Sequence, residues 1–260
     1  MKKFKFIFLM LLIIFTLNSP LLCQSEEQGL IRDIRFSAGA EFEYLKRTVV
    51  WDAVTEDTSA LKSLLFTFLP EIDINNRFYI RGIIGYTSSD FGAATFRELP
   101  ISVEMDVGSI GGMLIGGEPE IFMFETGDFE IGAKGQYVYY SGSEKSWPVP
   151  GLNVEGSVTG KPNWNRLQAG LTVTYVGMRN LLPYIFVAYD NLWGKYDIVQ
   201  TIQSLTGTQQ REISSRGKFN ATIGSIFELS ERARLTGEVN ILPHSDGIDL
   251  GFMAGVWFTF

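Results

Sequence analysis

The feature that most constrains the fold is a regular alternation of apolar with small or polar side chains, which is clearest in the last eleven residues. Successive side chains of a β-strand point to opposite sides, so alternate residues share a face. In a strand covering 250–260 the shared face is apolar, and it consists of Leu250, Phe252, Ala254, Val256, Phe258 and Phe260. A face this apolar must be covered by a protein core or by lipid.

Similar alternation recurs along the whole chain and predicts ten strands. Short connections at 75–77, 125–128, 177–180 and 230–232 alternate with longer ones, which would gather at the opposite end of the sheet. We therefore predict an all-β fold, a single up-and-down antiparallel transmembrane β-barrel of about ten strands over residues 26–260. A count of twelve remains open if the longer connections add pairing. The expected strands are 33–45, 61–74, 78–87, 109–124, 129–140, 165–176, 181–192, 218–229, 233–241 and 248–260.

A water-soluble barrel would also alternate, with its apolar face inward. Three features favour lipid instead. The expected strands reach the roughly 9 to 11 residues that cross a bilayer at a steep tilt, and tyrosines such as Tyr86 and Tyr189 cluster near the long connections, as in an interfacial girdle. In addition, the face opposite the apolar one is charged, like the interior of a membrane barrel, at Arg35, Glu41, Glu43, Glu71, Arg81, Lys134, Arg166, Lys218, Glu228, Arg234 and Glu238.

The first 25 residues have the layout of a secretory signal peptide. Lys2, Lys3 and Lys5 precede an apolar run over 6–15, which is too short for the roughly 20 residues of a spanning helix. The one cysteine, Cys23, lies in this region, so cleavage after it would leave no disulfide. Lipidation of Cys23 is the alternative, and the bulky Leu22 before it argues against that modification.

Charge and motifs narrow the set of partners. Loss of residues 1–25 removes three of the 22 basic residues and no acid, leaving 19 against 29 acidic residues, a charge of −10. We therefore expect no nucleic-acid partner. The glycine-rich segment 108–117 lacks the Gly-Lys-Ser/Thr of a phosphate-binding loop, and we expect no cofactor.

Three short hairpins place an acid opposite a base on the polar face. Folding each hairpin back on its turn pairs Glu71 with Arg81, Glu228 with Arg234, and Lys134 with Glu120 or Glu118. In a narrow barrel such pairs would close much of the lumen. The alternative is that they are solvated side chains in a water-filled lumen.

Four tryptophans fall in or beside the long connections, which makes them a candidate loop binding surface for an extracellular ligand. They are Trp51, Trp147, Trp164 and Trp193. The alternative is that these rings pack on each other or anchor the barrel rim in lipid headgroups.

Catalytic and metal-binding constellations are weak. His244 is followed by Ser245 and Asp246, yet neighbours on a turn rarely point at one another, so we expect no catalytic residue. The acidic pairs Glu56-Asp57, Glu104/Asp106 and Asp246/Asp249 could offer oxygen ligands to calcium, but acidic loop residues are usually just solvated, so we expect no metal site.

The signal-peptide layout, the alternating strands, the short-turn and long-loop asymmetry, and a final strand carrying Val256, Phe258 and Phe260 resemble a bacterial outer-membrane β-barrel protein. The resemblance implies contact with outer-membrane lipids, termini in the periplasm, and recognition of that final strand by the barrel-assembly machinery. It identifies a class and implies no activity.

The leading functional hypothesis is a non-enzymatic surface protein with a largely occluded, charge-paired lumen, acting structurally or in binding and adhesion through its loops. A narrow channel for small polar solutes is the alternative. An outer-rim enzyme of protease or lipid-hydrolase type is a third hypothesis.

Overall fold

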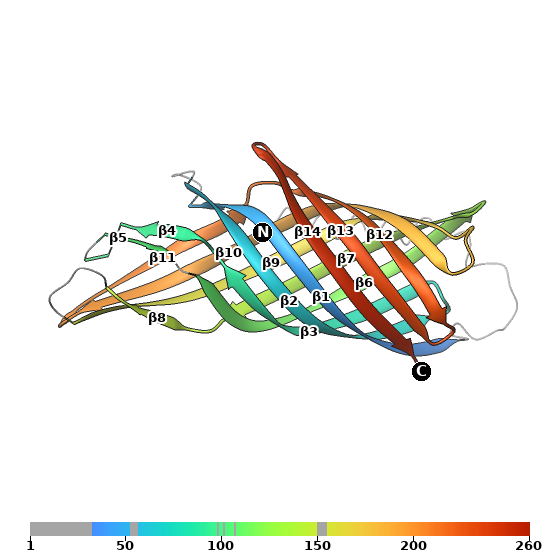
Figure 1. Ribbon diagram of the computed structural model, residues 1–260, viewed down its shortest axis with the longest axis horizontal. Helices are drawn as coiled ribbons and strands as arrows, with labels where there is room; N and C mark the ends of the chain where they lie inside the picture. Colours follow the sequence, from blue (N-terminus) through green and yellow to red (C-terminus); the bar gives the residue numbers. More distant parts are fainter. Residues whose placement is uncertain (1–32, 53–56, 98, 101, 107, 150–154) are drawn as a thin grey trace, which may run out of the picture. The chain divides into compact units, whose positions relative to one another are not determined.

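The computed structural model describes residues 33–52, 57–97, 99–100, 102–106, 108–149 and 155–260 (Figure 1). The expected signal peptide, residues 1–25, lies outside these residues. Among the residues described, no helix is long and apolar enough to span a membrane.

The described residues form fourteen strands rather than the ten expected, and the four extra strands fall in connections expected to be loops. These four are short or belong to hairpins: β4 (Ala93–Phe96), β5 (Val103–Asp106), β8 (Lys145–Pro148) and β11 (Leu205–Ser215). The others are β1 (Ile34–Trp51), β2 (Asp57–Ile74), β3 (Phe78–Asp90), β6 (Ser109–Thr126), β7 (Phe129–Gly142), β9 (Gly156–Tyr175), β10 (Leu181–Ile202), β12 (Phe219–Ser230), β13 (Ala233–His244) and β14 (Gly247–Thr259).

Several strands continue past their expected ends because their alternation changes sense there. In β10 we expected the strand to stop near Leu192, yet it runs to Ile202, with Tyr196 and Ile198 buried inside and Lys195 exposed outside. Apolar side chains that point inward and polar ones that point outward suit a sheet surrounded by water. At the long-loop end of the sheet, therefore, the inner face is apolar and the outer face is polar, which is the reverse of the short-turn end.

The tight turns at the other end have local causes. Asn75 and Asn76 adopt φ angles of 60° and 54° between β2 and β3, and Gly127 adopts 60° between β6 and β7. Asparagine and glycine tolerate this left-handed region better than other residues. Each turn thus reverses the chain within a few residues and fixes the register of its hairpin.

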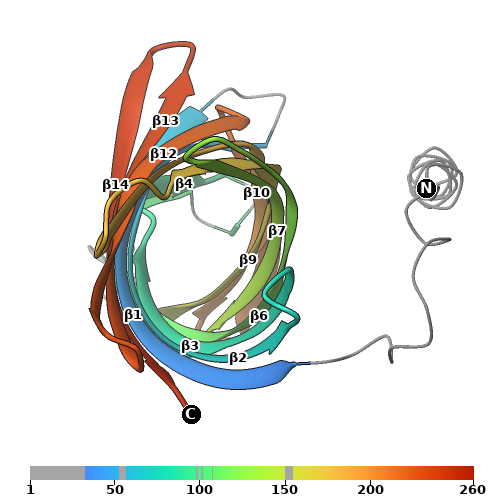
Figure 2. The same ribbon diagram turned by 90° about the vertical axis from the view of Figure 1, so that its right-hand side faces the viewer.

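Twelve of the strands in the described chain form one antiparallel sheet that closes on itself, and it closes by two routes (Figure 2). At the short-turn end the hydrogen bonds pass through β12, β13 and β14 back to β1, which gives a ring of ten strands among the described residues. Beyond Tyr189 and Leu45, β10 and β1 instead pair with β11. The ring through β11 contains eight of the described strands, so the barrel narrows toward the long-loop end.

The faces of the sheet are divided as the sequence predicted. Phe66, Leu171 and Phe258 point outward with 59%, 54% and 52% of their surface exposed, whereas Glu71 is 2% exposed inside the barrel. Tyrosines also lie on the outer face at Tyr86, Tyr137, Tyr139 and Tyr189. The all-β, up-and-down antiparallel fold expected from the alternation is confirmed.

Candidate functional site

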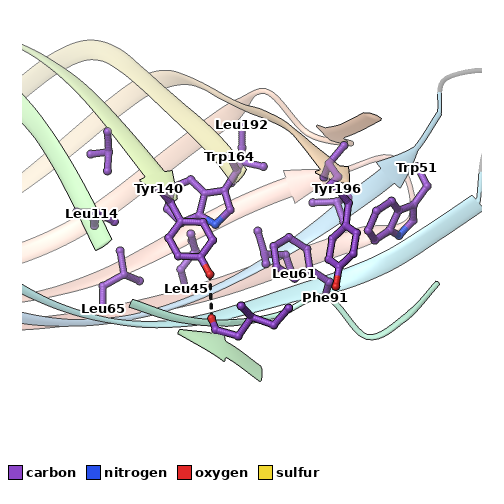
Figure 3. Close-up of a cluster of buried hydrophobic side chains, with 14 of the residues drawn as sticks. Leu45, Trp51, Leu61, Leu65, Phe91, Leu114, Tyr140, Trp164, Leu192 and Tyr196 are labelled. Atoms are coloured by element: carbon purple, nitrogen blue, oxygen red, sulfur yellow. Dashed lines mark hydrogen bonds between the residues drawn. The ribbon is translucent and has the colours of Figure 1, made fainter. Parts of the chain in front are cut away.

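The interior of the barrel at the long-loop end is filled by aromatic rings, which we call the aromatic plug. The rings touch one another: the centroid of the Tyr196 ring lies 5.9 Å from that of Trp51 and 5.6 Å from that of Phe91, and Tyr140 stacks near Trp164 at 5.2 Å (Figure 3). Each ring is at most 1% exposed. The aromatic plug consists of Trp51, Phe91, Phe96, Tyr140, Trp164 and Tyr196.

The narrowed ring explains why this end can be filled. A barrel of about eight strands has an interior just wide enough for side chains. Gly160 gives Tyr196 its place, because a Cβ atom on Gly160 would lie 2.5 Å from the tyrosine hydroxyl. Tyr140 is fixed by its hydroxyl, which donates to the carbonyl of Ile110 at 2.8 Å (Figure 3).

The segment between β3 and β6 supplies two of the rings and lies against the end of the barrel. Phe91 and Phe96 are both fully buried. Arg211 on β11 donates from Nη1 to the Thr95 carbonyl at 2.7 Å, and its Nε contacts Asp52 Oδ2 at 2.6 Å. The arginine therefore joins this segment to the ends of β1 and β11.

A polar cavity of about 320 Å³ lies in the ten-stranded part, toward the short turns. Its wall includes Glu43, Arg81 and Lys134. A second polar cavity of about 200 Å³ lies at the turn end and shares Tyr79, Glu228 and Arg234 with the first. The interior is thus polar in its turn-end half and apolar in its loop-end half.

Arg81 is the centre of the charge network in this half. Its Nε lies 2.5 Å from Glu71 Oε2, and its Nη1 lies 2.5 Å from Glu118 Oε1 and 3.0 Å from Glu120 Oε2. Lys134 Nζ lies 3.9 Å from Glu118 Oε2. The guanidinium thus joins β2, β3 and β6 across their inner face.

Glu228 and Arg234 face each other in register, but among the contacts of the described residues their side chains form no ion pair with each other. Arg234 reaches across the lumen, and its Nη2 lies 2.9 Å from Glu71 Oε1. Glu71 is almost fully buried, so water screens its attraction for Arg234 less than that of Glu228, which is exposed near the turn end. The expected Glu228–Arg234 ion pair is therefore wrong, although both residues line the polar cavity.

Sequence reasoning placed Glu43 and Arg166 on the polar face but missed the charge cluster that Arg166 forms with Asp190 and Arg47, at the point where the ring changes from ten strands to eight. Asp190 is fully buried, and its Oδ2 lies 3.2 Å from Arg47 Nη1 and 3.0 Å from Arg166 Nη2. Arg47 also donates to the carbonyls of Asp190 and Gly217 at 2.9 and 2.6 Å. The alternation around Tyr189 was sufficient to place Asp190 inside, but Arg47 lies beyond the expected end of its strand.

At the same junction, the Asp249 carboxylate accepts a backbone hydrogen bond that a neighbouring strand would otherwise accept. Its Oδ2 accepts from the backbone N–H of Thr48 at 2.5 Å, just where β1 leaves β14 and before it reaches β11. Buried backbone groups need such partners when sheet pairing is interrupted. Arg47 and Asp249 therefore satisfy the backbone at the change of ring size.

The proposed loop surface of four tryptophans is not formed. Trp51 and Trp164 belong to the aromatic plug, and Trp147 on β8 packs against the buried cluster. Trp193 lies on the outer face of β10, 37% exposed, with its ring centroid 6.4 Å from that of Tyr137. We predicted that these tryptophans lie in or beside loops. They lie on strands, because the strands continue beyond the apolar band.

His244 contacts an acid, as in a serine hydrolase, but the hydroxyl beside it belongs to Thr48 and not to Ser245. Its Nε2 lies 3.6 Å from Asp249 Oδ2 and 3.3 Å from Thr48 Oγ1. The Ser245 hydroxyl instead donates to Asp246 at 3.2 Å and accepts from Arg216 Nε at 2.8 Å. These contacts hold the β13–β14 turn against the junction.

For the candidate calcium ligands, Glu56 lies outside the described residues. Asp246 Oδ2 pairs with Arg216 Nη2 at 2.9 Å, and Asp249 is engaged at the junction. In the described part of the chain, no group of three or more His, Cys, Asp and Glu side chains could hold a metal ion.

The C-terminal strand closes the ten-stranded ring. Val256 pairs with Ala40 on β1 and with Leu235 on β13, and Phe258 pairs with Ala38. The Phe260 N–H donates to the Phe36 carbonyl at 3.0 Å, and its side chain is 83% exposed. Phe258 and Phe260 therefore stand on the outer face at the turn end, whereas Trp257 is buried inside the barrel.

A closed antiparallel sheet with apolar side chains outside and charged side chains in its interior is the architecture of a transmembrane β-barrel. Comparison with solved structures specifies the kind. The chain has the fold of a bacterial outer-membrane β-barrel protein.

The outer membrane protease OmpT from Escherichia coli is similar in fold, with 11% identity, coverage of 91% of this chain and 100% of that chain, and a TM-score of 0.54. An outer membrane channel from Pseudomonas putida F1 matches at 8% identity over 91% of this chain and 99% of that chain, with a TM-score of 0.42. Ail, the attachment invasion locus protein of Yersinia pestis, matches at 10% identity over 87% and 97%, with a TM-score of 0.33. No protein-family model and no curated protein matches the sequence.

Proposed function

We propose that the protein is an integral outer-membrane barrel whose lumen is closed and which acts, without enzymatic chemistry, through its structure and its outer rim. Its termini lie in the periplasm and its long connections face outside. The assembly machinery reads the final strand with Val256, Phe258 and Phe260, and lipid surrounds the apolar band.

The aromatic plug is the observation that carries this proposal. Six rings, each at most 1% exposed, occupy the narrowed end of the barrel. A hydrated solute would have to displace these packed rings, and deleting a buried Phe or Trp side chain by mutation to Ala costs about 3–5 kcal/mol of folding stability. The charge network adds a second obstruction in the turn-end half of the lumen, because Arg81 and Arg234 both form ion pairs with Glu71.

The surface that remains for a partner is polar rather than aromatic. Two of the four candidate tryptophans are buried in the aromatic plug, so they support closure instead of contact with a ligand. The strands and connections beyond the apolar band carry exposed ion pairs and hydrogen bonds. Lys195 on β10 donates to Gln210 on β11 at 3.0 Å, and Arg216, which follows β11, pairs with Asp246 in the β13–β14 turn at 2.9 Å. A binding or adhesion role through this rim requires a partner with polar, charged groups.

The test is conductance in planar bilayers. The full-length protein should give no large, stable openings. The double variant Trp164→Ala/Tyr196→Ala removes two rings from the aromatic plug and should admit small solutes. The matched control Trp193→Ala/Tyr189→Ala removes the same ring types from the outer face and should stay closed. Large openings in the unmodified protein would refute the proposal.

A narrow channel for small polar solutes is the second candidate. It is favoured by the two polar cavities, which share lining residues and reach from the turn end to the middle of the barrel. Liposome swelling separates the two functions. Uptake of small polar solutes by the unmodified protein would support the channel, whereas uptake only in the Trp164→Ala/Tyr196→Ala variant supports the closed barrel.

A further inference from the structure

The polar cavity carries more acid than its basic side chains neutralise. Seven glutamates and four basic residues line it. Each of the four bases already has a carboxylate partner: Arg81 and Arg234 contact Glu71, Lys134 contacts Glu118, and Arg166 contacts Glu43.

Glu41 and Glu238 are the carboxylates left over deep in the cavity. Within the described part of the chain, neither has a basic group within 4.0 Å. Glu238 accepts a hydrogen bond from the hydroxyl of Tyr184. Buried carboxylates without a counterion are costly, and a bound cation is one way to compensate them.

A glycine, Gly255 on β14, lies between the strands that carry these two glutamates. Glu41 on β1 pairs with Gly255 on β14, and Gly255 pairs with Thr236 on β13, two residues before Glu238. A Cβ atom on Gly255 would lie 2.7 Å from Glu41 Cγ and 2.6 Å from Thr236 Oγ1. Glycine at this position therefore leaves room for the side chains of both neighbours.

A second, independent observation comes from two other strands of the cavity wall, β9 and β12. Thr172 Oγ1 and Asn220 Oδ1 both line the cavity and are buried without a hydrogen-bond partner. Their residues are 8% and 0% exposed. Buried polar atoms are almost always hydrogen-bonded, so these two acceptors indicate a donor that occupies the cavity.

The chemistry of that donor follows from the wall. Carboxylates and neutral oxygens accept hydrogen bonds, and an ammonium group supplies three donors with a positive charge. A cavity of about 320 Å³ is at the small end of ligand sites, which run from about 300 to 1,000 Å³, and Phe186 and Trp257 add apolar surface for a short carbon chain. We propose that the polar cavity binds a small organic cation with primary ammonium groups, which reaches it from the turn end past Tyr79, Glu228 and Arg234.

The experiment is calorimetric titration of the full-length protein, folded in detergent micelles, with putrescine. The neutral analogue 1,4-butanediol and calcium chloride are titrated in parallel. One putrescine should bind per barrel. Glu41→Gln and Glu238→Gln should each weaken binding by about ten-fold or more, the effect of losing a hydrogen bond to a charged group. Glu125→Gln, at an exposed position near the end of β6 and outside the cavity lining, should leave binding unchanged.

Three results would overturn the inference: butanediol binding as tightly as putrescine, calcium binding in the absence of putrescine binding, or putrescine binding that neither glutamine variant weakens. A heat-modifiable shift in gel mobility checks that each variant is folded. If a glutamine variant does not fold, Thr172→Val replaces it, because it removes the unpartnered hydroxyl at nearly constant volume, and it must also weaken binding. The site is independent of lumen closure, which the conductance experiment tests separately.

Discussion

Replacing Asp190 by asparagine should destabilise the barrel far more than replacing an exposed acid. Asp190 is fully buried at the junction where the ring of strands narrows. Its Oδ2 is within 3.2 Å of Arg47 Nη1 and 3.0 Å of Arg166 Nη2, and it also accepts from Gln168 Nε2 at 2.8 Å. Asparagine keeps the shape of the side chain but removes the charge that two buried arginines share.

The expected cost follows from this geometry. Breaking a buried ion pair by removing one partner costs about 3–5 kcal/mol, because the remaining charge stays buried without compensation. Arg166 keeps Glu43, whose Oε1 lies 3.0 Å from Arg166 Nη1, whereas the nearest carboxylate of Arg47 is lost. We therefore expect about 3 kcal/mol, at the lower end of that range.

The assay is urea unfolding of the protein folded in micelles, followed by tryptophan fluorescence. The matched control is Asp33→Asn, which breaks an ion pair of 2.8 Å between side chains that are each about half exposed. Exposed pairs contribute roughly 0–1 kcal/mol. Equal losses of unfolding free energy in the two variants would mean that the junction cluster is not a buried, mutually dependent charge network.

Two further predictions concern the faces of the barrel and the aromatic plug. Leu171→Arg, on the lipid-facing side, should lower the free energy of unfolding in bilayers by roughly 2–4 kcal/mol. Thr174→Arg, whose side chain lines the polar cavity, should lower it by less than half of that. Similar losses in the two variants would show that the two faces are assigned wrongly. Tyr196→Phe should raise the free energy of unfolding by about 1 kcal/mol, because the buried hydroxyl has no hydrogen-bond partner, and a clear loss of stability in urea titrations would contradict this.

The strands that cross the apolar band were predictable, because there the alternation and the tight turns agree. Asn75, Asn76 and Gly127 mark turns that the structure forms with left-handed backbone. The strand ends near the loops were not predictable in the same way. Between Lys195 and Ile198 apolar and polar residues still alternate. Here, however, the apolar side chains point into the barrel and the polar ones point outward.

The candidate site was only partly predictable for a related reason. Cross-strand neighbours within one hairpin follow from the turn, and Glu71 does lie opposite Arg81. Contacts across the lumen depend on how the whole sheet closes, so the ion pair between Arg234 and Glu71 joins residues 163 positions apart that no hairpin brings together.

Within the apolar band, the sequence by itself determined which face of each strand is apolar and which is polar, because the side-chain period of two is a local property of the backbone. Only the tertiary structure decided where the barrel is closed. The ring changes from ten strands to eight when β11 replaces β12, β13 and β14 as the partner of β10 and β1. That change sets the width of the lumen, and the width decides that Trp51, Trp164 and Tyr196 fill one end while the other end keeps a polar cavity.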